Sequence, residues 1–154
     1  MSDASAGRSG VRALGIDPGT KRIGVAISDR SGTIASPLIV LERTRSRQHD
    51  DAEIARIVRE EEVEVVVVGL PVNMDGSHGA SAKAAIADAR RLATVVDVPI
   101  ELHDERRTTV SADRSMREAG LDGVERRQRV DKVAAAIMLQ SWLDSRANAV
   151  RPVR

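Results

Sequence analysis

The sequence lacks cysteine, phenylalanine and tyrosine, and Trp142 is the single aromatic side chain among its 154 residues. Without cysteine there can be no disulfide framework, thiolate zinc site, iron–sulfur ligation or cysteine nucleophile. The scarcity of aromatics argues against nucleic-acid modules that hold bases by stacking. With 24 Lys+Arg against 23 Asp+Glu, the net charge is +1. Any contact with phosphates must therefore be local rather than a property of the whole surface.

Long apolar runs are also missing. The longest strongly apolar stretch, residues 63–72, is far too short to cross a bilayer. Residues 1–10 are polar and lack the apolar run of a signal peptide. We therefore expect a soluble, cytoplasmic protein with no membrane partner. Residues 11–145 form one predicted domain, between a flexible N-terminal tail (1–10) and a flexible C-terminal tail (146–154) that are small, polar or basic and without period.

Three strands are predicted in the first third of the chain. Residues 11–17 and 22–28 alternate between apolar and polar side chains, as half-buried strands do. Residues 33–41 are a third predicted strand, and Pro37 within it favours a sheet edge because proline has no N–H for a neighbour. The three strands together predict an antiparallel meander.

The rest of the chain alternates between helical periodicity and short apolar runs. Residues 63–70 are nearly all apolar and β-branched, which is typical of a strand covered on both faces. A meander followed by β-α-β units predicts an α/β fold with a five-stranded mixed sheet flanked by helices. Besides the meander, the expected elements are strands at 63–70 and 99–103 and helices at 49–61, 81–95, 109–119 and 126–146.

Acidic residues lie beside three of these predicted elements. Asp17 ends the first strand, Glu105 follows the strand at 99–103, and Asp131 lies near the start of the last helix. Carboxyl ends of parallel strands meet at one sheet edge, where ligands bind in such folds. Each acid alone has an ordinary structural explanation, but gathered carboxylates repel one another unless a cation balances them. Mg²⁺ prefers such oxygens, and two ions about 4 Å apart can clamp the oxygens of a phosphodiester displacement.

Four segments, in order along the chain, resemble the YqgF family, also called RuvX-like. They are GIDPGTKRIGVAISD (15–29), VVVGLPVNMDG (66–76), DERRTT (104–109) and VDKVAAAIMLQSWLD (130–144). The resemblance implies an RNase H-like fold for residues 11–145 and a metal-dependent endonuclease using Mg²⁺ or Mn²⁺, with two ions. It also implies that Asp17, Glu105 and Asp131 are the catalytic, metal-binding acids.

The sequence departs from the family pattern at one position of the third motif, where Arg107 replaces a residue that is usually apolar. Asp104 adjoins Glu105, and the sequence alone leaves open whether it contributes to the metal site. Neighbouring strand residues point to opposite faces, which favours a single ligand from this pair. We expect contacts with substrate phosphates from the glycine-containing turn after Asp17, from the loop after residue 70 and from a basic cluster near the last two acids: Gly19, Thr20, Lys21, Asn73, Arg106, Arg127 and Lys132.

The resemblance favours a hydrolase that processes the 5′ end of pre-16S rRNA in ribosome biogenesis, with the ribosome or its assembly factors as partners. One alternative is a Holliday-junction resolvase in DNA recombination and repair, which would need a dimer to cut symmetrically. Another is a catalytically silent RNA-binding assembly factor. A sugar-kinase or actin-type ATPase also has a strand followed by a pattern like residues 17–20, but it binds nucleotide between two such domains. No apolar surface stripe is evident, so a monomer is the default expectation and a homodimer the alternative.

Overall fold

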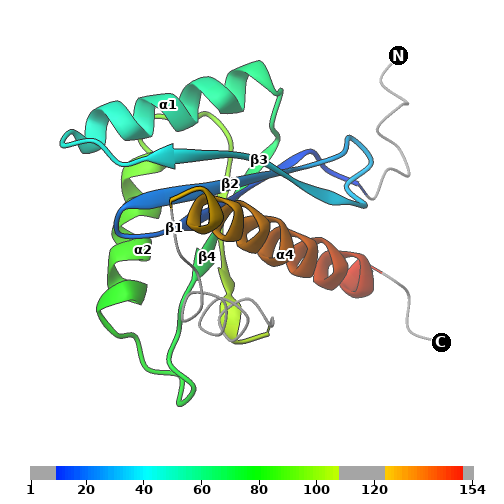
Figure 1. The fold of residues 1–154 in the computed structure, drawn as a ribbon. Helices are drawn as coiled ribbons and strands as arrows, with labels where there is room; N and C mark the ends of the chain where they lie inside the picture. The colour runs from blue at the N-terminus through cyan, green and yellow to red at the C-terminus, as the bar shows by residue number, and fades with distance from the viewer. Residues whose placement is uncertain (1–9, 108–123, 151–154) are drawn as a thin grey trace.

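The computed structural model describes residues 10–107 and 124–150 (Figure 1). A five-stranded sheet in the order β3-β2-β1-β4-β5 forms its centre. β1 pairs antiparallel with β2 and parallel with β4, and β5 runs parallel to β4. The predicted mixed sheet is confirmed, and so is the edge position of the strand that contains Pro37. The strands are β1 (Ala13–Pro18), β2 (Arg22–Ser28), β3 (Ala35–Glu42), β4 (Val65–Leu70) and β5 (Ile100–Asp104).

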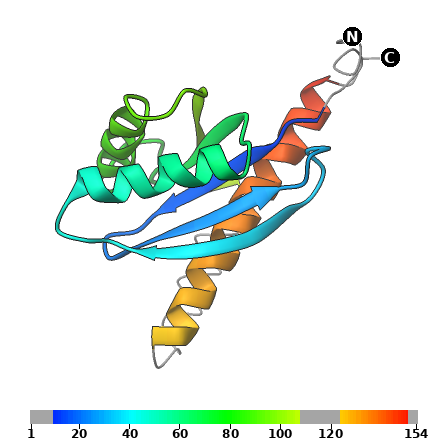
Figure 2. The ribbon, with the colours of Figure 1, turned by 90° about the horizontal axis from the view of Figure 1, so that it is seen from above.

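Helices cover both faces of the sheet. Figures 1 and 2 show α1 and α2 on one face and the long α4 crossing the other. The side chain of Ser46 caps α1 by accepting a hydrogen bond from the His49 N–H. A single 3₁₀ turn, η2 (Glu105–Arg107), follows β5 directly. The helices are α1 (Arg47–Glu60), α2 (Ala80–Leu92) and α4 (Val124–Val150).

The alternation of side chains along the strands produces one large apolar core on each face of the sheet, and Leu70, Ala82 and Ala85 form a smaller cluster. Leu14, Ile16 and Val66 belong to the core beneath α1 and α2. Ala13 and Val67, from the same strands, belong to the core beneath α4. Trp142 is buried in that second core, and its indole N–H donates to a Glu101 carboxylate oxygen at 3.3 Å.

Glycines set how closely α4 approaches the sheet. A Cβ on Gly15 would lie 2.9 Å from the Cβ of Leu139 in α4. On Gly24 it would overlap the main-chain carbonyl oxygen of Asp131. A main-chain atom in a helix cannot yield as a side-chain end can, so Gly24 is the stricter requirement. These glycines allow α4 to pack directly against β1 and β2 near Leu139 and Asp131.

The C-terminal boundary of the last helix corrects the sequence prediction. α4 continues to Val150, so residues 146–150 are helical rather than part of a loose tail that begins at 146. The segment consists mainly of alanine and arginine, which favour helix, and contains neither glycine nor proline before Pro152. The helix predicted at 109–119 lies outside the described residues. Within the described ranges, no helix combines the length and apolarity that crossing a bilayer demands.

The glycine contact predicts a specific loss of stability. Gly24→Ala should lower the free energy of unfolding by roughly 1–3 kcal/mol, because α4 must move away from β2 to accommodate the methyl group. Urea denaturation followed by circular dichroism measures the change. Gly79→Ala is the control, because its Cβ would meet only the Asn73 side chain at 3.4 Å, an ordinary contact. Equal losses in the two variants would contradict the close approach.

Candidate active site

A cavity of about 370 Å³ lies where the carboxyl end of β1, η2 and the first turns of α4 meet. All three acids that the sequence singles out line it, although they are separated by up to 114 positions in the chain (17 to 131). β1, β4 and β5 are parallel, so their carboxyl ends share one edge of the sheet as predicted. We name this hollow the acidic cavity, and its complete lining is Asp17, Pro18, Gly19, Thr20, Lys21, Arg22, Pro71, Ser81, Glu105 and Asp131.

Asp17 occupies the centre of this edge and is only 5% exposed. Its direct cross-strand partner on β2 is Gly24, which lacks a side chain. On the other side, β4 places Gly69 immediately after Val68, the partner of Ile16. Residues opposite one another share a face of the sheet, so the two glycines leave space beside the Asp17 side chain. The other two acids approach through that space.

Glu105 fills the space above β4 and is 3% exposed. A Cβ on Gly69 would lie 2.6 Å from Oε1 of Glu105, so the carboxylate lies directly over this glycine. Burial, together with the nearby charge of Asp104, raises the pKa of Glu105 to about 7. The side chain is therefore poised between its neutral and charged forms near neutral pH.

Asp131 reaches the cavity from α4 and forms an ion pair there. Its Oδ2 accepts a hydrogen bond from Nε of Arg22 at 2.8 Å. Both side chains are largely removed from solvent, at 17% exposure for Arg22 and 14% for Asp131. Charge-assisted bonds of this kind are stronger than those between neutral groups. Arg22 therefore holds Asp131 in place and balances its charge.

Asp104 and Glu105, of which the family resemblance implies Glu105 as the ligand, have different surroundings in the structure. Asp104 is half-buried and accepts hydrogen bonds from Arg106: from its main-chain N–H at 2.9 Å and from Nη2 at 2.7 Å. Glu105 lines the cavity with Asp17, whereas Asp104 is not among the lining residues. The transition from β5 into the 3₁₀ turn η2 separates the two side chains.

The residues expected to contact phosphates divide into two groups. Gly19, Thr20 and Lys21 line the acidic cavity. Asn73 instead donates to Ser77 Oγ within its own exposed loop. Arg106, as described above, is bonded to Asp104. Lys132 is half-buried on α4 and is not a lining residue, and the side chain of Arg127 lies outside the described residues.

Arg22 and Ser81 line the cavity but are absent from the sequence-based set. For Arg22 a signal exists in the strand pattern. Arg22 and Gly24 are two residues apart on β2, so they share the face on which Asp17 lies opposite Gly24. Ser81 comes from the first turn of α2, and nothing in the local sequence connects it with the acids.

The donor set of the cavity fits a hard divalent cation by its chemistry. Its charged ligands are carboxylates from three elements, the type that Mg²⁺ and Mn²⁺ favour. In the part of the chain that the structure describes, however, no three acidic or histidine side chains already gather tightly enough to hold one ion. An ion at this site would have to compete with Arg22 for Asp131. The acids thus share a cavity without forming a completed coordination shell.

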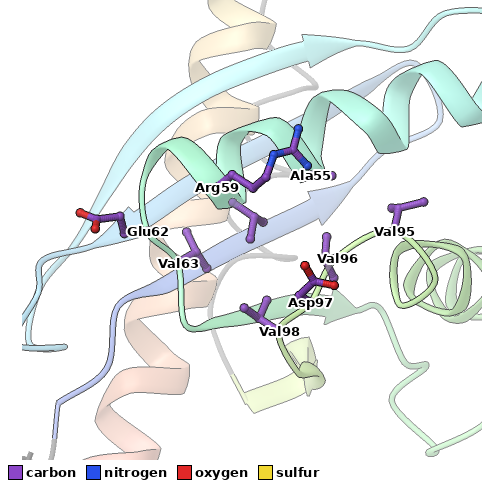
Figure 3. Close-up of a pocket in the computed structure, with 9 residues that line it drawn as sticks. Ala55, Arg59, Glu62, Val63, Val95, Val96, Asp97 and Val98 are labelled. Atoms are coloured by element: carbon purple, nitrogen blue, oxygen red, sulfur yellow. The ribbon is translucent and has the colours of Figure 1, made fainter.

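A second cavity, of about 230 Å³, has a different character (Figure 3). It lies between the C-terminal end of α1 and the segment that leads from α2 to β5, and it shares no lining residue with the acidic cavity. Val63, Val95, Val96 and Val98 contribute to its walls. It contains no comparable set of acids.

Comparison with known proteins identifies the family of this chain. The model of the RuvX family, described as Holliday junction resolvase, matches residues 11–145. The chain belongs to the RuvX family. That span includes all three cavity acids and every strand of the sheet.

Curated relatives of this RuvX-family chain are named "Putative pre-16S rRNA nuclease". One from Anaeromyxobacter sp. (strain Fw109-5) is 52% identical over 136 residues, which cover 88% of this chain and 98% of the relative. Another from Nocardia farcinica (strain IFM 10152) is 47% identical over 148 residues, which cover 92% of this chain and 82% of the relative.

Solved structures agree with the predicted RNase H-like fold. RuvC of Thermus thermophilus, solved in complex with a Holliday junction substrate, superposes with a TM-score of 0.58 at 16% identity. The match covers 93% of this chain and 99% of RuvC. A second T. thermophilus RuvC structure gives a TM-score of 0.54 at 15% identity, with 92% and 99% coverage. At these identities the likeness concerns the fold.

The raised pKa of Glu105 predicts a pH-dependent effect of its replacement. The folded state binds the Glu105 proton more tightly than the unfolded chain does. The stability that protonated Glu105 contributes is therefore fully present below its ordinary pKa of about 4.5 and is lost as the pH rises through about 7. In EDTA, Glu105→Gln should therefore gain roughly 1–3 kcal/mol over the parent protein at pH 8 and much less at pH 5. Urea titrations at both pH values measure the difference. An equal gain at both would contradict the assignment.

Proposed function

We propose that this RuvX-family chain is a metal-dependent endonuclease that hydrolyses phosphodiester bonds in structured nucleic acid, with the 5′ end of pre-16S rRNA as its substrate. The observation that carries the proposal is the convergence of three carboxylates from separate elements in one cavity. Family membership and the names of close relatives support the same chemistry. They also favour hydrolysis of nucleic acid over the ATPase alternative.

Asp17, Glu105 and Asp131 are the proposed catalytic residues and would hold Mg²⁺ or Mn²⁺, with two ions bound. Such ions supply charge stabilisation at the phosphate and lower the pKa of bound water. Asp17 would be the central ligand because it lies between the two glycine-lined spaces. Without a cation the pKa of Glu105 is raised to about 7, so ion binding would compete with protonation of this carboxylate near neutral pH. Asp131 would be the third ligand, and its pairing with Arg22 would have to give way for it to hold an ion.

Substrate binding would use the turn between β1 and β2. Thr20 and Lys21 are exposed at the rim of the acidic cavity, and Gly19 lets the main chain approach a ligand there. The one aromatic side chain, Trp142, is buried in the core. Binding would therefore depend on the nucleic-acid backbone rather than on base stacking. Asn73, Arg106, Arg127 and Lys132 remain proposed phosphate contacts beyond this turn.

Resolution of four-way DNA junctions is a second candidate function, favoured by the description of the matching family model. Symmetric cleavage would require two copies of the acidic cavity and hence a dimer. A cleavage assay on a pre-16S 5′ leader, a four-way junction and matched duplexes separates the two functions. Preference for the leader by a monomer supports rRNA processing, and preference for the junction by a dimer supports resolution.

Asp17→Asn should abolish the proposed activity without loss of the fold. Cleavage of the preferred substrate in Mg²⁺ should fall by at least about 100-fold, because the substitution removes the central negative ligand while keeping its size. Binding in EDTA should persist. Mg²⁺ should raise the melting temperature of the parent protein more than that of the variant.

Asp104→Asn is the matched control for the charge change and should keep most of the activity. Asp17→Asn protein that still cleaves normally, once contaminating nuclease is excluded, would contradict the mechanism. Parent protein that binds these nucleic acids but cleaves none would support a silent assembly factor instead.

Gly69→Ala tests the position of Glu105 without changing any charged group. The new methyl group would displace the flexible carboxylate end of Glu105, so stability should change by less than about 1 kcal/mol. Cleavage should still fall by at least about 10-fold, since small misplacements of catalytic groups are costly. Gly79→Ala serves as the control in the same assays. Full activity of the Gly69→Ala protein would contradict the proposed role of Glu105.

A further inference from the structure

A third cavity, of about 440 Å³, lies beside the acidic one and is lined mainly by basic and hydroxyl side chains. Thr20 and Lys21 line both cavities, so the β1–β2 turn forms the boundary between them. The other walls come from the end of β3 and the start of α1. We name this hollow the basic cavity, with the lining Thr20, Lys21, Glu42, Arg43, Thr44, Arg45, Arg47 and Asp50.

Hydrogen bonds fix the frame of the basic cavity. The main-chain N–H of Arg43 donates to the Lys21 carbonyl oxygen at 2.9 Å, and Nε of Arg43 donates to the Gly19 carbonyl oxygen at 2.6 Å. Thr44 donates to the buried Asp50 carboxylate through its main-chain N–H and its hydroxyl. The segment that carries Arg45 is therefore held against the turn that carries Lys21.

Four basic side chains outnumber the two carboxylates, Glu42 and Asp50, in the lining of the basic cavity. The Asp50 carboxylate accepts hydrogen bonds from Thr44, and Arg43 forms an ion pair with Asp88 of α2 at 2.9 Å. Arg47 also pairs with Asp88 at 3.5 Å, but its side chain is 65% exposed. An ion pair with so exposed a partner contributes little to stability. Over the described ranges, the side chains of Lys21 and Arg45 form no hydrogen bond or ion pair. Both are exposed.

These features match a phosphodiester group rather than a base. An exposed guanidinium, an ammonium and the Thr20 hydroxyl are donors suited to phosphate oxygens, whereas the single hydroxyl proton of Thr44 is already donated to Asp50. No aromatic side chain lines the cavity, so no stacking surface for a base is present there. The connection through Thr20 and Lys21 makes a continuous path from the acids to Arg45.

We propose that the basic cavity binds a backbone phosphate of the same nucleic-acid strand whose scissile phosphate occupies the acidic cavity. Arg45 and Arg47 are its main contacts, and Lys21 bridges the two cavities. This inference rests on the proposed function, since it takes the substrate to be a nucleic-acid strand. It adds a binding site on β3 and α1, away from the sequence motifs that mark the acids.

Binding measurements in EDTA test the site independently of cleavage. The probes are a dye-labelled RNA hairpin with a single-stranded tail and a labelled four-way DNA junction, followed by fluorescence anisotropy from low to moderate salt. Arg45→Gln should weaken binding of the better probe about 3- to 10-fold and reduce the slope of log affinity against log salt by about 1. Arg45→Gln/Arg47→Gln should weaken it further, and Arg45→Lys should retain most of the affinity.

Arg30→Gln is the matched control, because it also removes one exposed arginine. Arg30 lies in the turn between β2 and β3, at the opposite end of β2 from the basic cavity, and pairs with exposed Glu62. It should bind like the parent protein. Thermal melts of all variants confirm the fold, which exposed substitutions should leave intact.

The outcomes separate this inference from the proposed function. Loss of affinity in Arg45→Gln supports the basic cavity even if the parent protein cleaves neither probe, in which case only the endonuclease proposal fails. If the parent protein cleaves but Arg45→Gln and Arg30→Gln have equal affinities and salt slopes, the basic cavity is not a phosphate site. A parent protein that binds neither probe would also overturn the inference.

Discussion

The close contact between α4 and the sheet is the constraint on which the rest of the structure depends. Gly15 and Gly24 remove the side chains that would hold the helix away from β1 and β2. The same contact buries one of the two large apolar cores and brings Asp131 to the end of β1. A single packing requirement thus provides stability and positions one of the acids. Any change that lifts the helix would affect both.

This arrangement buries acidic groups, which is electrostatically unfavourable, and the surroundings compensate the charge of each acid differently. Asp131 is balanced by Arg22, whereas the raised pKa of Glu105 favours its neutral form. Asp17 lies between them at 5% exposure. A bound divalent cation would favour all three charged forms together, because its field acts on every oxygen in the cavity. Stability and ion binding should therefore be coupled in this protein.

The surface carries opposite charges on the two sides of the β1–β2 turn. On one side the turn borders the acids, and on the other it borders Arg45 and Arg47. Thr20 and Lys21 belong to both sides. A chain with a net charge of +1 can attract a polyanion only through such local asymmetry. The Arg43 side chain holds the two sides together, because it donates a hydrogen bond to the Gly19 carbonyl oxygen and forms an ion pair with Asp88.

The sequence by itself determined the antiparallel meander, the five-stranded mixed sheet and the edge position of Pro37, because side-chain alternation and β-α-β connections are local patterns. It also indicated that the strand ends next to Asp17 and Glu105 share one edge of the sheet. The resemblance implied Glu105 rather than Asp104, and the tertiary structure shows how the two differ, because Glu105 lines the cavity from the 3₁₀ turn after β5 and Asp104 does not line it. The Arg22–Asp131 pair joins residues 109 positions apart. The basic cavity likewise combines the β1–β2 turn with the start of α1. A local pattern can indicate the face on which a strand residue such as Arg22 lies, but it does not identify the distant segment that packs there, because the tertiary fold brings the two together.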